Sequence, residues 1–250
     1  MLVSSVAWGQ APSYTAAGIV NASDYSPGPF APNSVLSLFG TNLSYASAPV
    51  IASQDTMSGG RLPTQLGGVS VLFDNTPAPL LFVSAGQVNF MAPSTEIPGT
   101  SKVQLVRQSI AGPAVTVALA PSAPALFAPA GYVLAQDYQN NYASVTSDAP
   151  AHAGDMIVLY CTGLGPTQPN PNPGEIALTA ANIANLATLQ VLLNGAAIDS
   201  SLIKYAGLTP SSTGLYQINF LLPGGLTSDV EIRVSDAGQA SAPGWKLAVR

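Results

Sequence analysis

One short motif occurs twice in this 250-residue chain, and that repeat constrains the fold more than any other feature. Gln87-Val88-Asn89-Phe90 returns 130 residues later as Gln217-Ile218-Asn219-Phe220, and a proline follows three residues after each phenylalanine. Two further segments, residues 34–43 and 155–164, match at an offset of 121. Insertions in loops explain the change of offset, because a longer loop adds little closure entropy. The sequence therefore predicts two copies of one unit.

The boundary between the copies is predicted at a stretch of proline and alanine, residues 120–125, where no apolar alternation is present. A connector of this composition is short and rather stiff. We expect one domain at residues 12–120 and a second at 121–250, each close to the size of an immunoglobulin-like sandwich. Residues 1–11 stand apart from both.

Strand patterns recur along the whole chain. In residues 229–235 the aliphatic side chains of Val230, Ile232 and Val234 alternate with polar ones, which is typical of a half-buried strand. Alternation at residues 189–193 ends at Asn194-Gly195, a strong hairpin signal. Residues 176–192 are predicted as a long loop with at most one helical turn, which runs into the strand that starts at Leu189. The fold class predicted is all-β, with two tandem immunoglobulin-like β-sandwich domains.

Charge is scarce, and this limits the classes of partner. The chain has 7 Lys+Arg, 12 Asp+Glu and a charged fraction of 8 %, far below the usual fraction of about 25 %. No basic run exists that would hold a phosphate backbone, so the sequence predicts no nucleic-acid partner. Attraction to an anionic membrane is unexpected for the same reason. The sequence contains no run of 18 apolar residues, so it predicts no membrane span.

The first eleven residues carry a signal for the compartment. They are apolar and end in small residues before Pro12, which is typical of the end of a secretory signal peptide. Gly9 with Ala11, or Ala7 with Gly9, fits the cleavage rule. The alternative is an ordinary N-terminal strand. We expect a secreted protein, extracellular or at the cell surface.

Two family resemblances add to this reading. Phe39-Gly40-Thr41-Asn42-Leu43 resembles the strand and Gly-x-Asn turn of the IPT/TIG domain, an immunoglobulin-like fold. Nearly the whole chain also resembles an uncharacterised domain family found at the C-termini of secreted acidobacterial proteins. This second resemblance implies export, two sandwich units and no known catalytic residue. It rests on segments such as Gly18-Ile19-Val20-Asn21-Ala22, Leu66-Gly67-Gly68-Val69, Tyr160-Cys161-Thr162-Gly163-Leu164-Gly165-Pro166 and Gly214-Leu215-Tyr216-Gln217.

Catalytic and metal-binding patterns are missing from the sequence. Cys161 lies in an apolar run, which favours a buried thiol. His152 is the single histidine, and the residues between Asp148 and Asp155 read as a turn. One Cys and one His do not make a zinc site, and the aspartates are scattered. We therefore predict no enzyme, no cofactor and no metal; a hydrolase that uses His152 is the least favoured hypothesis.

A hairpin rich in Tyr and Asn, residues 132–144, is the candidate contact surface. Tyrosine offers a large apolar area at a low entropic cost, and amides bind polar ligands. The alternative is a plain hairpin whose aromatic side chains pack across strands. The candidate contact residues are Tyr132, Tyr138, Asn140, Asn141 and Tyr142.

The low charge also favours association, since Lys and other charges normally protect edge strands. Our first hypothesis is a non-enzymatic extracellular structural protein that associates with copies of itself into a fibre, tube or layer. The alternative is a cell-surface binding or adhesion module for a polysaccharide or a partner protein.

Overall fold

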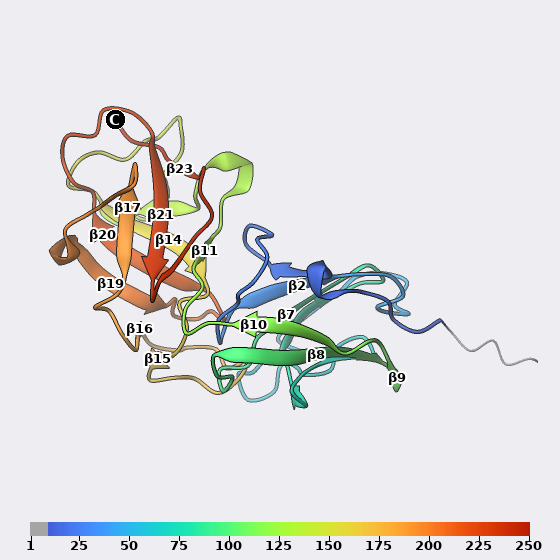
Figure 1. Cartoon of the computed structure of the whole chain (residues 1–250). Coiled ribbons are helices and arrows are strands. Elements are labelled where there is room, and N and C mark those ends of the chain that lie inside the picture. Colours follow the sequence, from blue (N-terminus) through green and yellow to red (C-terminus); the bar gives the residue numbers. More distant parts are fainter. Residues whose placement is uncertain (1–9) are drawn as a thin grey trace, which may run out of the picture.

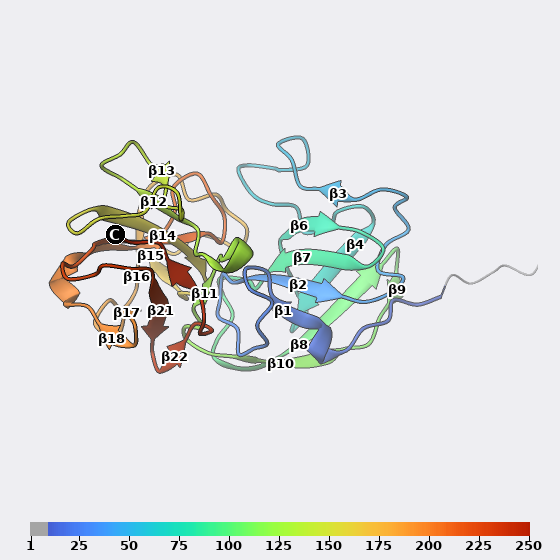
Figure 2. The ribbon, with the colours of Figure 1, turned by 90° about the horizontal axis from the view of Figure 1, so that it is seen from above.

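A computed structural model describes residues 10–250, and this part of the chain is built from antiparallel strands. It contains no α-helix, and its three 3-10 helices are η1 (Ala16–Gly18), η2 (Pro129–Gly131) and η3 (Ser200–Leu202). The strands gather into two groups that lie side by side (Figures 1 and 2). The all-β prediction is confirmed. No helix among residues 10–250 has the length and apolarity that a membrane crossing needs.

The N-terminal group contains two five-stranded sheets. The first sheet, as we call it below, has the order β1 (Ile19–Asn21), β2 (Val35–Phe39), β7 (Gln87–Met91), β6 (Leu80–Val83) and β3 (Val50–Ile51). The other has the order β10 (Val115–Leu119), β8 (Gly99–Arg107), β4 (Val69–Phe73) and β5 (Thr76–Pro77), with β9 (Ile110–Ala111) beside β8. Apolar side chains from both sheets form one core, which includes Phe73 and Phe90.

The C-terminal group contains a sheet of eight strands and a sheet of five. The eight-stranded sheet runs β13 (Ala143–Ser144), β12 (Ala135–Asp137), β14 (Met156–Thr162), β20 (Tyr216–Leu221), β19 (Ile203–Leu208), β16 (Ala181–Ile183) and β15 (Thr167–Gln168), with β11 (Ala125–Leu126) beside β14. The five-stranded sheet runs β18 (Ala196–Ala197), β17 (Gln190–Leu193), β21 (Val230–Asp236) and β22 (Gln239–Ala240), with β23 (Lys246–Leu247) beside β21. A second core lies between them.

The repeated motif takes the same place in both groups. Its strands are β7, between β2 and β6, and β20, between β14 and β19. Phe90 and Phe220 are both fully buried, one in each core. The predicted alternation in β21 is also present, since Val230, Ile232 and Val234 are all buried. Period-2 patterns thus identify the inner faces of these strands correctly.

One local prediction is wrong. Residues 176–192 are not simply a loop, because they contain β16, which pairs with β15 and β19. No helical turn forms there. The three residues Ala181, Asn182 and Ile183 are too few to show a period, and pairing with a distant strand determines their conformation.

Several hydrogen bonds join the two groups of strands. The Val35 amide donates to Thr162 Oγ1 at 3.1 Å, and the Ser94 hydroxyl donates to the Pro171 carbonyl at 2.9 Å. The Ala123 amide of the connector donates to the Gly163 carbonyl at 2.7 Å. The connector is therefore tied to β14 and its following turn. The division into domains 12–120 and 121–250 stays a prediction.

A buried arginine binds the first described residue of the chain to the N-terminal group of strands. Arg107, at the end of β8, donates to the carbonyls of Gln10 and Asn42 and to the Tyr45 hydroxyl. Its guanidinium also lies 3.6 Å from the centroid of the Tyr45 ring. Most of the predicted signal-peptide remnant or N-terminal strand, residues 1–11, lies outside the described residues. Its nature stays a prediction.

Candidate functional site

The predicted contact hairpin ends in a tight turn with an unusual occupant. The Ala143 amide donates to the Asn140 carbonyl at 3.0 Å, and Asn141 and Tyr142 have φ values of 52° and 59°. Two successive left-handed residues make this a type I′ turn. Asparagine is common in that conformation, whereas a bulky side chain there is an outlier. Tyr142 is therefore held in a strained backbone at the tip of the turn.

The strained residue presents its ring to a second exposed tyrosine. The rings of Tyr138 and Tyr142 meet edge to face, with centroids 5.2 Å apart and planes at 81°. The two side chains are 53 % and 48 % exposed. This geometry suits the aromatic quadrupoles, and it leaves ring surface open to solvent.

A third tyrosine, Tyr160 on β14, belongs to the same surface. Ile157, Leu159 and Cys161 of this strand point into the core, so Tyr160 points to the opposite, outer face. Its hydroxyl donates to Gln136 Oε1 at 2.7 Å. Partial burial raises the pKa of Tyr160, and the neighbouring Tyr142 phenol raises it further. The outer face of the eight-stranded sheet thus brings three tyrosines together.

Two amide side chains on the neighbouring strand lie next to Tyr160. On β20, Tyr216, Ile218 and Phe220 are buried, so Gln217 and Asn219 lie on the outer face. Gln217 is the register partner of Tyr160, and its Nε2 donates to Asn219 Oδ1 at 3.0 Å. The residues on this side of the two central strands carry no charge. Val158 and Thr162 are fully buried, and the partly exposed ones are Met156, Tyr160, Gln217, Asn219 and Leu221.

A fourth tyrosine lies beyond the amides. Tyr205 on β19 is the register partner of Asn219, and its hydroxyl donates to the Leu208 carbonyl at 2.7 Å. Gly207 makes room for it, since a Cβ there would lie 2.7 Å from the Tyr205 hydroxyl. Tyrosines therefore flank the Gln217–Asn219 pair on both sides.

The two asparagines of the predicted set have different positions. Asn140 lines a hollow of about 300 Å³ together with Asp137, Asp148, His152 and Asp155. Asn141 is exposed at the turn tip. Within this set, a ring-to-ring contact joins Tyr138 and Tyr142. Sequence reasoning missed Gln136, Tyr160, Gln217 and Asn219, although the repeated Gln-x-Asn motif and its alternation contain the signal for the last two.

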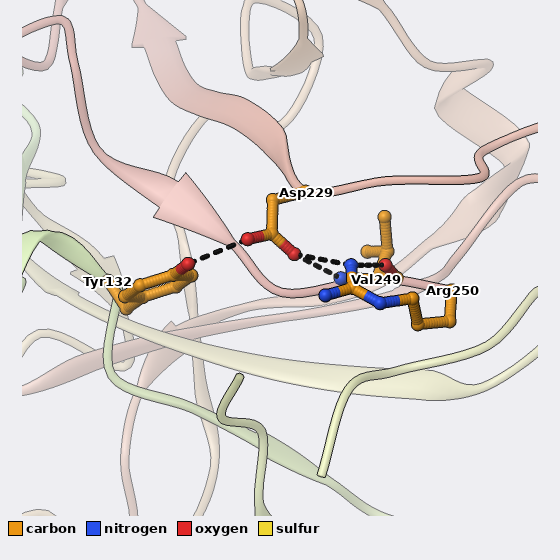
Figure 3. Close-up of polar contacts among 4 residues, drawn as sticks. All are labelled: Tyr132, Asp229, Val249 and Arg250. Atoms are coloured by element: carbon orange, nitrogen blue, oxygen red, sulfur yellow. Dashed lines mark hydrogen bonds and ion pairs between the residues drawn. The ribbon is translucent and has the colours of Figure 1, made fainter. Parts of the chain in front are cut away.

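Tyr132 is engaged in an internal network instead (Figure 3). Its hydroxyl donates to Asp229 Oδ2 at 2.6 Å, and Asp229 Oδ1 lies 2.8 Å from Arg250 Nη1. The Val249 amide donates to the same Oδ1 at 3.4 Å. The Tyr132 hydroxyl lowers the pKa of Asp229, and Arg250 and the Val249 amide lower it further. The network ties the segment after η2 to the C-terminal residues.

The two residues considered for catalysis, His152 and Cys161, lie in a turn and in the core. His152 is exposed, and its backbone amide donates a hydrogen bond to Asp155 Oδ2 at 2.6 Å, as in a turn. Its Nδ1 lies 3.7 Å from Asp155 Oδ2. Cys161 is completely buried, and burial strongly raises the pKa of its thiol. Between residues 10 and 250 no cluster of three metal-ligating side chains is present.

Comparisons with solved structures give distant likenesses. A surface glycan-binding protein of a xyloglucan utilization locus in Bacteroides uniformis is 11 % identical, with TM-score 0.28, over 94 % of this chain and 49 % of that one. The mixed-linkage glucan counterpart from Bacteroides ovatus is 11 % identical, with TM-score 0.33, over 88 % and 42 %. The tandem immunoglobulin domains A164–A165 of titin are 10 % identical, with TM-score 0.24, over 86 % and 87 %.

The chain spans half or less of the two glycan-binding proteins, and these low scores assign no site to it. No curated protein sequence matches. The resemblance to the acidobacterial domain family stays a prediction. Residues 22–119 match the model of the IPT/TIG domain, and they contain the Phe39–Leu43 segment in which that resemblance was expected.

Proposed function

We propose that this protein is a cell-surface or extracellular carbohydrate-binding protein that holds a neutral, β-linked polysaccharide on the outer face of its eight-stranded sheet. One observation carries the proposal: Tyr160, which neighbours the exposed Tyr142, is the register partner of Gln217. Gln217 belongs to a hydrogen-bonded amide pair, and the outward residues of the two central strands carry no charge. We therefore favour the alternative hypothesis, a binding module, over self-association.

The chemistry of such a face suits a sugar. A β-linked pyranose has apolar C–H faces that pack on aromatic rings, as Tyr138 and Tyr142 would offer. Its hydroxyls need partners that both donate and accept, and the amides of Gln217 and Asn219 do both. Since the outward residues of β14 and β20 are uncharged, a neutral polysaccharide fits better than an acidic one.

The strained turn supports a role for the Tyr142 ring. A left-handed backbone costs a non-glycine residue roughly 1–2 kcal/mol, and a glycine would avoid this cost. Strain of this kind is concentrated at functional sites. A tyrosine at φ 59° that presents half of its surface to solvent is therefore consistent with selection for the ring rather than for the turn.

Electrophoresis through gels that contain polysaccharide tests the proposal. We expect xyloglucan, mixed-linkage β-glucan or hydroxyethyl cellulose to retard the protein, and acidic polygalacturonate to leave its mobility unchanged. Tyr138→Ala and Tyr142→Ala should each weaken retardation by roughly tenfold, as loss of a central aromatic contact does. Tyr132→Phe is the matched control, because its hydroxyl serves the Asp229 network. Unchanged mobility of the wild-type protein in all three neutral gels would refute the proposal.

Self-association into a fibre, tube or layer stays a prediction. The low charge favours it, as it favours any contact made by an uncharged β-surface. Negative-stain electron microscopy of the secreted protein is its test. Regular assemblies would support it, whereas a monomer of about 24–25 kDa by mass photometry, the mass without or with residues 1–11, would count against it.

A further inference from the structure

The first sheet repeats the amide pair of the proposed site. Val88 and Phe90 of β7 are buried, so Gln87 and Asn89 lie on the outer face of that sheet. Gln87 Nε2 donates to Asn89 Oδ1 at 2.8 Å, the same contact that Gln217 makes with Asn219. The Ser37 hydroxyl also donates to Asn89 Oδ1, at 3.0 Å, which fixes the amide further.

An exposed tyrosine in a left-handed backbone is repeated as well. Tyr25 has φ 57° and is 61 % exposed, and its ring lies 5.8 Å from the ring of Phe39. Phe39 is 38 % exposed and is the register partner of Gln87. Phe39 therefore has the place beside Gln87 that Tyr160 has beside Gln217, and Tyr25 neighbours Phe39 as Tyr142 neighbours Tyr160. A bulky residue with this backbone is uncommon, so its presence next to the aromatic residue that flanks each amide pair is informative.

Aromatic surface continues on the other side of the amides. Phe82 on β6 is the register partner of Asn89, and Ile51 on β3 pairs with Phe82. Rings therefore flank Gln87 and Asn89 on both sides, as they flank Gln217 and Asn219. The residues on this side of β1, β2, β6 and β7 carry no charge. Ser37 and Met91 are buried, and the ones at least partly exposed include Val20, Val35, Phe39, Phe82, Gln87 and Asn89.

We infer that the outer face of the first sheet, around Tyr25, Phe39, Gln87 and Asn89, is a second binding site for the same class of neutral, β-linked polysaccharide. This inference rests on the proposed function. The ligand class follows from the chemistry that both faces share: ring surfaces for sugar C–H faces, amides for hydroxyls, and no charge.

Two sites on one chain make the protein bivalent. Binding at one face raises the effective concentration of the same polymer at the other, which strengthens retention on a long polysaccharide without any new contact. A bivalent protein also joins separate polymer chains. The expected activity is therefore the cross-linking of polysaccharide, which a protein with a single site does not perform.

Four proteins distinguish one site from two in the same gels: the wild type, Tyr25→Gly with Phe39→Ser, Tyr142→Gly with Tyr138→Ser, and the combination. Tyr25→Gly and Tyr142→Gly relieve the left-handed backbone, so they preserve the fold. Circular dichroism and thermal melting check this. Should Phe39→Ser unfold the chain, Tyr25→Gly alone serves as the first-sheet variant.

We expect each single-face variant to lose roughly tenfold or more in apparent affinity and to remain retarded, while the combined variant is not retarded. Wild-type protein should raise the light scattering of a xyloglucan solution, and neither single-face variant should. If the first-sheet variant behaves as wild type while Tyr142→Gly with Tyr138→Ser abolishes retardation, the second site is refuted and the proposed function stands. If wild-type protein is not retarded, both fail.

Discussion

Tyr142 packs edge to face on Tyr138, at 5.2 Å between ring centroids, from a backbone conformation that suits glycine better than tyrosine. The contact with Tyr138 explains how the Tyr142 ring is held in place. The left-handed backbone shows that a tyrosine does not stabilise the turn. Tyr25, in the other half of the molecule, also contacts a ring from a left-handed backbone: it lies 5.8 Å from Phe39, with the ring planes tilted at 56°. Local stability and the placement of exposed rings are therefore opposed at two equivalent positions.

Replacing Tyr142 separates these two effects. Tyr142→Gly and Tyr142→Ala both remove the ring, but only glycine adopts φ 59° without strain. We expect the glycine variant to be more stable than the alanine variant by about 1 kcal/mol in chemical unfolding. Both should bind polysaccharide equally weakly. Equal stability of the two variants would show that the turn is not strained.

Tyr132→Phe should reveal the network of Figure 3 through the pH dependence of stability. The Tyr132 hydroxyl is the first cause that lowers the pKa of Asp229. A carboxyl with a lowered folded-state pKa stabilises the fold above its unfolded pKa of about 3.9, and this contribution disappears as the pH falls through the folded value.

The variant should therefore melt at a lower temperature than the wild type near neutral pH, and the difference should shrink on acidification towards pH values below both pKa values. Thermal melts across the acid range measure it. A difference that stays constant with pH would mean that the hydroxyl acts on stability without the charge of Asp229.

Gly163 is a close-contact position at the connector. It has φ 83°, and a Cβ there would lie 2.1 Å from the Ala123 carbonyl oxygen. Gly154 is the matched control, with φ 89° and open space around its Cβ position. We expect Gly154→Ala to cost about 1 kcal/mol and Gly163→Ala at least about 2 kcal/mol more, since it adds a clash to the strain. Equal costs in urea unfolding would contradict the described contact with the connector.

The thiol of Cys161 should be unreactive in the folded protein. It is fully buried, and burial raises its pKa, so the reactive thiolate is absent at neutral pH. A chromogenic disulfide reagent should modify it only in denaturant, at the rate of unfolding. Rapid modification of native protein would place the thiol at the surface and revive the question of its chemistry.

The sequence was most informative where a pattern repeats or alternates. The alternation of Val230, Ile232 and Val234 predicted a strand and its buried face correctly, because burial of one face imposes period 2. Asn194-Gly195 predicted the hairpin between β17 and β18, with φ values of 50° and 80°. By contrast, β16 depends on its pairing with β15 and β19, and three residues cannot reveal that.

The candidate site was predictable only in part. Tyr138 and Tyr142 are neighbours across a local turn, so sequence proximity was enough to bring them together. Tyr132 lies in the same segment, but its partner Asp229 is 97 residues away, and no local pattern predicts that contact. The contribution of Tyr160 and Gln217 depends on the pairing of β14 with β20, which is a property of the folded sheet.

The most direct test of the central claim is the affinity of the protein for soluble xyloglucan, measured by titration calorimetry on the wild type and on Tyr142→Gly with Tyr138→Ser. The account predicts that the wild type binds and that the double variant, folded and at least as stable at the turn, has an affinity lower by roughly tenfold or more. Equal binding by the two proteins, or none by the wild type with xyloglucan, mixed-linkage β-glucan and hydroxyethyl cellulose, would contradict the assignment of the outer face of the eight-stranded sheet as a polysaccharide site.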